Sequence, residues 1–232
     1  MVAADLISSW QKNEKRDYLV DSINFLKERK IKYEFSFPRN NLPQLPYLVV
    51  VNHFKRPFFV RKQLATTLES LITAALVTVA LSTISKRRTA WVAKNNLAAT
   101  FPFKFTIVRR AQLAAIYCYD LIGTNEKYPF SNYRQWEQKL KSGSNIAFCP
   151  EGAPSGKLKS VNGDFDNYIR RLKKAIPQLQ ILPVSVYYID KTFFAKFNKP
   201  LKIESSSDDI AKKAIQKIAE NLPHGLRGKY FA

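Results

Sequence analysis

Short apolar runs alternate with longer segments of helical periodicity along most of this chain. Apolar runs predict strands, and apolar residues that recur at three- or four-residue spacing predict helices. The expected strands are 32–37, 47–51, 89–93, 120–123, 145–150 and 180–189, followed by a hairpin-like pair over 193–203. The expected helices are one or two over 3–30, then 64–84, 105–119, 132–143 (ended by Gly143), 163–176 and a last helix with Ser206 and Asp209 as its capping box.

Strands that alternate with helices predict an α/β fold. We expect one domain over residues 1–232, with a mixed, mostly parallel central sheet flanked by helices. Within it, residues 1–31 form an N-terminal helical segment, 32–204 the α/β core, and 205–232 the C-terminal helix and tail. The first ten residues, with Asp5 and Trp10, lack the basic and then apolar pattern of a secretory signal.

For each of two helical segments, the sequence allows either packing on the protein or contact with a membrane surface. Residues 71–84 contain no charge, and the helix over 64–84 is apolar on all sides, so it is either a core helix or one that dips into a single leaflet. Its apolar stretch is too short to span a bilayer. The segment 3–30 either packs on the domain or carries Trp10 to an interface, and its balanced charge favours packing.

The charge of the chain favours an anionic partner. Of 232 residues, 38 are Lys or Arg and 18 are Asp or Glu, which gives a net charge of +20. Residues 51–110 hold eleven basic residues and one acidic residue, Glu69, so half of the surplus lies there. Nucleic acid, an anionic lipid surface or an acidic carrier protein would each fit such a field. The aromatic residues lie in apolar segments, which argues against nucleic acid.

Several chemistries are disfavoured by the motifs. There is no G-x-S-x-G sequence, and GAPSGKL (152–158) departs from a phosphate-binding loop. Cys118 and Cys149 are too few for a disulfide scaffold, and with His53 and His224 they show no metal-ligand spacing. Cys149 lies in an apolar run, which predicts a buried, inert thiol. We expect neither a metal nor a cofactor.

Two polar residues follow predicted buried strands. His53 ends VVVNH (49–53), and Glu151 lies in FCPEG (148–152). Polar residues at the ends of such strands commonly form the site of an α/β domain, and a histidine there is a candidate general base.

Five strings resemble the phospholipid/glycerol acyltransferase family, which includes bacterial lysophosphatidic acid acyltransferases. They are VVVNHFKRP (49–57), WVAKNNL (91–97), FCPEGAPSG (148–156), ILPVSVYY (181–188) and KFNKPLKI (196–203). The resemblance implies a glycerolipid acyltransferase-like fold. It also implies an enzyme that moves a fatty acyl group from acyl carrier protein or acyl-CoA to the hydroxyl of a lysophospholipid such as lysophosphatidic acid.

The resemblance assigns roles to single residues. His53 and Glu151 are the implied catalytic residues. The implied substrate-binding residues are Asn52, Arg56, Gly152, Lys157, Lys94, Arg110 and Lys127. The family carries an Asp five residues after the His, to orient the imidazole, where this chain has Phe58. Three explanations stay open: Glu151 or Glu69 orients His53, His53 acts without a carboxylate, or the site is silent.

The implied setting is a membrane surface. We expect peripheral association with the cytoplasmic face of a membrane, through the basic segment 51–110 around the base, and no nucleic acid partner. A catalytically silent lipid-binding relative and a basic nucleic-acid-binding protein remain as alternatives.

Overall fold

The computed structural model describes residues 3–38, 42, 45–52, 62–94, 105–124, 132–151, 157–158, 165–203 and 209–228. The α-helices are α1 (Ala3–Gln11), α2 (Tyr18–Glu28), α3 (Lys62–Ile84), α4 (Phe105–Cys118), α5 (Tyr133–Lys141), α6 (Phe165–Ala175) and α7 (Ile210–Asn221), and η2 (His224–Leu226) is a short 3₁₀ helix. The strands are β1 (Lys32–Ser36), β2 (Tyr47–Val51), β3 (Thr89–Lys94), β4 (Ile122–Thr124), β5 (Asn145–Phe148), β6 (Gln180–Ile189), β7 (Thr192–Phe197) and β8 (Leu201–Lys202).

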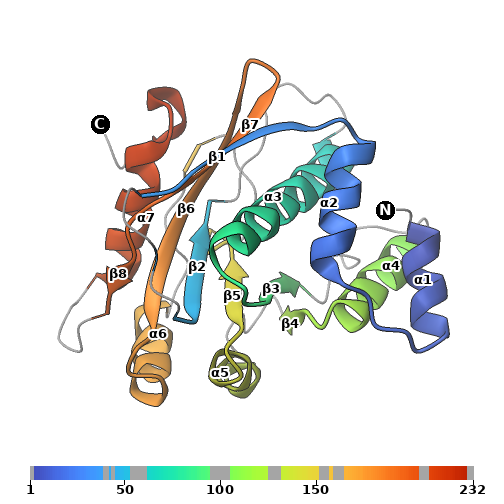
Figure 1. Cartoon of the computed structure of the whole chain (residues 1–232), viewed down its shortest axis with the longest axis horizontal. Coiled ribbons are helices and arrows are strands. Elements are labelled where there is room, and N and C mark those ends of the chain that lie inside the picture. The colour runs from blue at the N-terminus through green and yellow to red at the C-terminus, as the bar shows by residue number, and fades with distance from the viewer. Residues whose placement is uncertain are drawn as a thin grey trace.

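The described strands form one sheet in the order β1-β7-β6-β2-β5-β3-β4, and β8 pairs with the start of β6 (Figure 1). The strands β6, β2, β5, β3 and β4 are parallel to one another. β7 and β8 run antiparallel to β6, and β1 runs parallel to β7. The mixed, mostly parallel sheet confirms the predicted fold class.

Helices cover both faces of the sheet. Val49 and Val51 of β2 cluster with Val77 and Leu81 of α3 on one face. On the other face, the ring of Phe148 in β5 contacts rings of α5 and α6, because Trp136 and Phe165 lie 5.2 and 5.6 Å away by ring centroids. All five residues of β2 are buried, as expected of a central strand between two helical layers.

α3 is packed as a core helix. Leu76, Val77, Ala80 and Leu81 have no exposed surface, while Leu71 is 44% exposed. Among the helices that the structure describes, none combines the length and the hydropathy needed to cross a bilayer.

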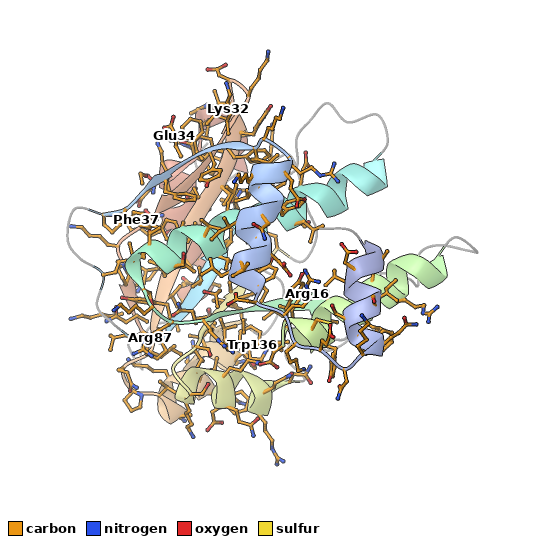
Figure 2. All side chains as sticks on the ribbon, turned by 45° about the vertical axis from the view of Figure 1, so that its right-hand side comes forward. Arg16, Lys32, Glu34, Phe37, Arg87 and Trp136 are labelled. Atoms are coloured by element: carbon orange, nitrogen blue, oxygen red, sulfur yellow. The ribbon has the colours of Figure 1, made fainter. Side chains whose placement is uncertain are left out.

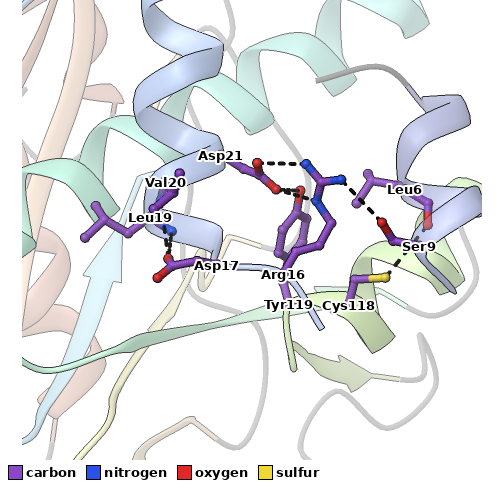
Figure 3. A network of polar contacts seen from close by, with 9 residues as sticks. All are labelled: Leu6, Ser9, Arg16, Asp17, Leu19, Val20, Asp21, Cys118 and Tyr119. Carbon is purple, nitrogen blue, oxygen red and sulfur yellow. Dashed lines mark hydrogen bonds and ion pairs between the residues drawn. The ribbon is translucent and has the colours of Figure 1, made fainter. Parts of the chain in front are cut away.

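A polar network fastens α2 to α1 and α4 (Figure 3). Arg16 donates to both carboxylate oxygens of Asp21, at 2.6 and 2.8 Å, and to Ser9 Oγ at 3.4 Å. Tyr119 donates its hydroxyl to Asp21 at 2.8 Å. Partial burial opposes ionisation of Asp21, but the hydrogen bonds from Arg16 and Tyr119 outweigh it and lower the pKa of this carboxyl. Charge-assisted bonds therefore hold the network together.

α1 packs on the protein rather than standing apart from it. Leu6 is buried against Ala114, Cys118 and Tyr119, and Trp10 is half-buried against the same cluster. The packed interpretation of the N-terminal segment therefore fits the structure.

Two predictions at the end of the chain were wrong. The segment 193–203 does not fold on itself, because β7 pairs with the end of β6 and β8 with its beginning. The tight turn lies earlier, at Asp190 and Lys191, which both have the positive φ of a two-residue hairpin turn (49° and 61°). The capping box fails at its described member, since Ser206 lies outside the described residues. Asp209 stands at the N-cap of α7 without a side-chain bond, and Asp166 of α6 accepts from Ala211 N.

Candidate functional site

The candidate site begins at the carboxyl ends of two adjacent strands. β2 and β5 are parallel neighbours, and their last aligned pair is Val50 with Phe148. Asn52 follows this pair by two residues and Glu151 by three, so both leave the sheet at the same edge. Asn52 is 5% exposed and Glu151 8% exposed. The structure therefore brings the two predicted strand ends together.

This edge is a switch point in the topology. The chain leaves β2 toward α3, on the face of Val49 and Val51, and leaves β5 toward α6, on the face of Phe148. Adjacent parallel strands whose connections go to opposite faces leave a crevice between their carboxyl ends, which is where α/β sheets bind ligands. The location of Asn52 and Glu151 is thus the one that topology alone would select.

Asn52 holds the end of β2 against β6. Its Nδ2 donates to Val186 O at 2.8 Å, and its Oδ1 accepts from Val186 N at 2.6 Å. The side chain thus satisfies both backbone groups of one buried residue and extends the contact between the two strands. This contact fixes the end of β2 beside β6. The predicted substrate contact of Asn52 stays a prediction.

Cys149 lies between the end of β5 and Glu151, and it is half-buried. Burial raises the pKa of its thiol, and the neighbouring Glu151 carboxylate raises it further. A thiol held protonated in this way is a poor nucleophile. Cys149 is therefore less buried than the sequence predicted, and its raised pKa agrees with the interpretation of an inert thiol.

Three other predicted site residues lie in the described part of the chain: Lys94, Arg110 and Lys157. Lys94 is the last residue of β3, so its backbone reaches the same edge as Asn52 and Glu151. Arg110 is exposed on α4. Lys157 is exposed and precedes Leu158, which donates its N–H to Leu226 O at 2.9 Å. Four predicted site residues lie outside the described residues: His53, Arg56, Gly152 and Lys127.

The expectation that the basic segment 51–110 surrounds the site is wrong for three of its residues. Lys86, Arg87 and Arg88 precede β3 and lie at the amino edge of the sheet, opposite Asn52 and Glu151. Arg87 donates to Gly143 O at 2.8 Å there, and Arg88 O accepts from Asn145 N at 2.8 Å. The reason is topological, since α3 carries the chain from the carboxyl edge to the amino edge between residues 62 and 84.

Metal-ligand candidates do not gather in the described part of the chain. No group of three or more His, Cys, Asp and Glu side chains there is placed to hold an ion.

Sequence comparisons and structural comparison differ in what they find. No protein-family model and no curated protein sequence matches the chain. A similar fold is found in the crystal structure of the 1-acyl-sn-glycerophosphate (LPA) acyltransferase PlsC from Thermotoga maritima. The TM-score is 0.53 at 21% identity, and the alignment covers 84% of this chain and 74% of that one. At this identity the likeness is one of fold.

Proposed function

We propose that this protein is an acyltransferase that moves a fatty acyl group from a thioester donor to the hydroxyl of a lysophospholipid. One observation carries the proposal: Asn52, which leads into His53, and Glu151 leave the sheet together at its switch point. The fold that supplies this switch point is similar to that of an LPA acyltransferase.

In the proposed reaction, His53 accepts the proton of the acceptor hydroxyl as its oxygen attacks the thioester carbonyl carbon. A C–O bond forms, the C–S bond breaks, and the thiol of the donor leaves with the proton. Glu151 accepts hydrogen bonds from the acceptor or from the loop around it. Phe58 stands where the family's orienting Asp would be, so His53 works without that partner.

The proposed substrates are acyl carrier protein or acyl-CoA as donor and a lysophospholipid such as lysophosphatidic acid as acceptor. The net charge of +20 supports docking on anionic lipid, at about 1 kcal/mol for each Lys or Arg near the surface. Sedimentation with anionic vesicles should therefore be strong and should weaken as salt rises. Equal binding to neutral vesicles would contradict this part of the proposal.

The deciding experiment is an acyl-transfer assay on the purified protein. A panel of lysolipids is offered with acyl carrier protein and CoA thioesters, and both ester and free thiol are measured. We expect one ester formed for each thiol released with at least one pair. Thiol release that does not depend on the acceptor would indicate a hydrolase instead.

A catalytically silent lipid-binding relative is the second candidate, and Phe58 favours it. Such a protein would bind vesicles and turn over no donor–acceptor pair. Phe58→Asp then separates a weakened site from a dead one, because only a weakened site gains rate when an orienting carboxylate is supplied.

A further inference from the structure

The outer edge of β1 is an exposed strand edge. β1 ends the strand order, and its only partner among the described strands is β7. Four of its five residues are exposed, with only Phe35 half-buried. Such an edge presents backbone N–H and C=O groups on which a further strand can pair.

The side chains of this edge carry opposite charges at close spacing. Lys32 and Glu34 lie on one face of the strand, and Tyr33 and Phe35 on the other. The rings of Tyr33 and Phe35 stack with centroids 5.0 Å apart. Neither Lys32 nor Glu34 has an ion pair with another described residue. Figure 2 labels both in the upper part of the view.

The order Lys-Tyr-Glu is self-complementary. When two copies of β1 pair antiparallel about a two-fold axis at Tyr33, Lys32 of each copy faces Glu34 of the other. A two-fold axis at Lys32 or at Glu34 would instead place like charges opposite each other, which is destabilising. The charges therefore favour the register with its axis at Tyr33, which joins two pairs of opposite charge. That register also places Ile31 opposite Phe35 on the aromatic face.

We propose that two copies of this chain associate through β1, antiparallel, with Tyr33 at the two-fold axis, so that one sheet continues through both. Two-fold pairing uses the same surface on both subunits, as self-complementary residues require. A five-residue strand covers less area than the roughly 1,200–2,000 Å² of a standard interface, so the dimer is weak and concentration-dependent. This surface is independent of the proposed acyltransferase site.

Charge reversal tests the pairing. Sedimentation equilibrium of the full chain over a concentration series should show reversible dimers. Lys32→Glu or Glu34→Lys alone creates two like-charge pairs per dimer and should weaken association about tenfold or more. An equimolar mixture of the two variants should recover it, because each facing pair again joins a carboxylate and an ammonium. Lys212→Glu, the same charge change on exposed α7, is the matched control and should associate like the wild type.

Cysteine crosslinking tests the register. Tyr33→Cys places two thiols across the two-fold axis and should form an intermolecular disulfide on mild oxidation. Ser36→Cys should not, because residue 36 faces residue 30 in this register. The wild type, whose own cysteines are buried or half-buried, gives the background. A monomer at all concentrations, failure of the mixture to recover association, or equal crosslinking at positions 33 and 36 would overturn the proposal.

Discussion

The two edges of the parallel sheet differ in the length of the segments that connect strands and helices there. At the amino edge, the segments that lead from helices into strands are short: 85–88, 119–121, 142–144 and 176–179, or three to four residues each. At the carboxyl edge, the segments that lead from strands into helices are 52–61, 95–104, 125–132 and 149–164, or eight to sixteen residues. Long segments on a rigid scaffold are where α/β proteins place their chemistry.

The polar residues at the two edges differ accordingly. At the amino edge, Arg87 and Asn145 bond to the backbone of neighbouring turns and strands. At the carboxyl edge, Asn52 does the same for Val186, but the chain then continues into His53 and the long segment. We conclude that polar residues at the amino edge close the fold, whereas those at the carboxyl edge also lead into the candidate site.

The largest effect is expected for His53→Ala. Loss of a general base should lower the turnover number by about 10²- to 10⁴-fold, since a positioned base contributes that much. Steady-state acyl-transfer kinetics measure the loss, and thermal unfolding checks that the fold is intact. Turnover equal to that of the wild type would refute the proposed mechanism and favour the lipid-binding alternative.

Two buried asparagines allow a direct comparison of the edges. Asn52→Ala leaves Val186 N–H and C=O without their partner. At about 1–3 kcal/mol for each of these two buried groups, it should lower the free energy of unfolding by about 2–6 kcal/mol. Asn145→Ala removes the acceptor of Tyr47 N–H, but it also removes a buried amide N–H that has no partner among the described residues, so it should cost less.

Activity distinguishes the two asparagine variants further. At a temperature where both variants are folded, only Asn52→Ala should lower turnover, because it alone displaces the entry to His53. Urea unfolding and acyl-transfer rates measured on the same samples give both quantities. Equal loss of activity in the two variants would mean that the edges do not differ in function.

Glu151→Gln separates two roles at the carboxyl edge. Hydrogen bonds to a charged group contribute about 1.5–3 kcal/mol. If Glu151 binds the acceptor, loss of its carboxylate should therefore raise the acceptor's KM about 10- to 100-fold. The pH–rate profile should then keep its shape. A shifted profile would show instead that Glu151 acts on His53.

The sequence predicts the sheet well because its central strands are buried along most or all of their length. The runs that became β2, β5 and β6 are continuous apolar stretches bounded by turns, and such runs are visible without any tertiary information. The pairing of β7 and β8 could not be predicted in the same way. β6 is ten residues long, and β7 pairs with its end while β8 pairs with its beginning. Which part of β6 each strand pairs with depends on tertiary contacts.

The candidate site, like the sheet, was predictable where a local pattern indicates it. Polar residues directly after a buried strand indicate the carboxyl edge, and this indication located Asn52 and Glu151. The hydrogen bond from Asn52 to Val186 joins residues 134 positions apart, so no local sequence pattern predicts it. The position of Lys86, Arg87 and Arg88 was missed because local charge density does not show which edge a helix of 23 residues reaches.

The smallest expected effect belongs to a region away from the strand ends that carry the candidate site, and it serves as the control for them. In the Arg16–Asp21–Tyr119 network the carboxylate accepts all of its bonds from within the chain. Asp21→Asn should therefore lower the free energy of unfolding at pH 7 by about 1–2 kcal/mol, as for a partly buried charge-assisted bond, and leave turnover unchanged.

The pKa of Asp21 is lowered in the folded protein. Between that value and the ordinary aspartate pKa of about 3.9, the unfolded chain binds more protons. The wild type's advantage over Asp21→Asn should consequently be complete above this range and shrink as pH falls through it. Urea unfolding of both proteins at pH 7 and toward pH 3 measures the difference, with Glu220→Gln, in an exposed pair with Lys217, expected to change stability by no more than about 0.5 kcal/mol. If Asp21→Asn lowered turnover as much as Asn52→Ala does, the losses at the carboxyl edge would reflect stability alone.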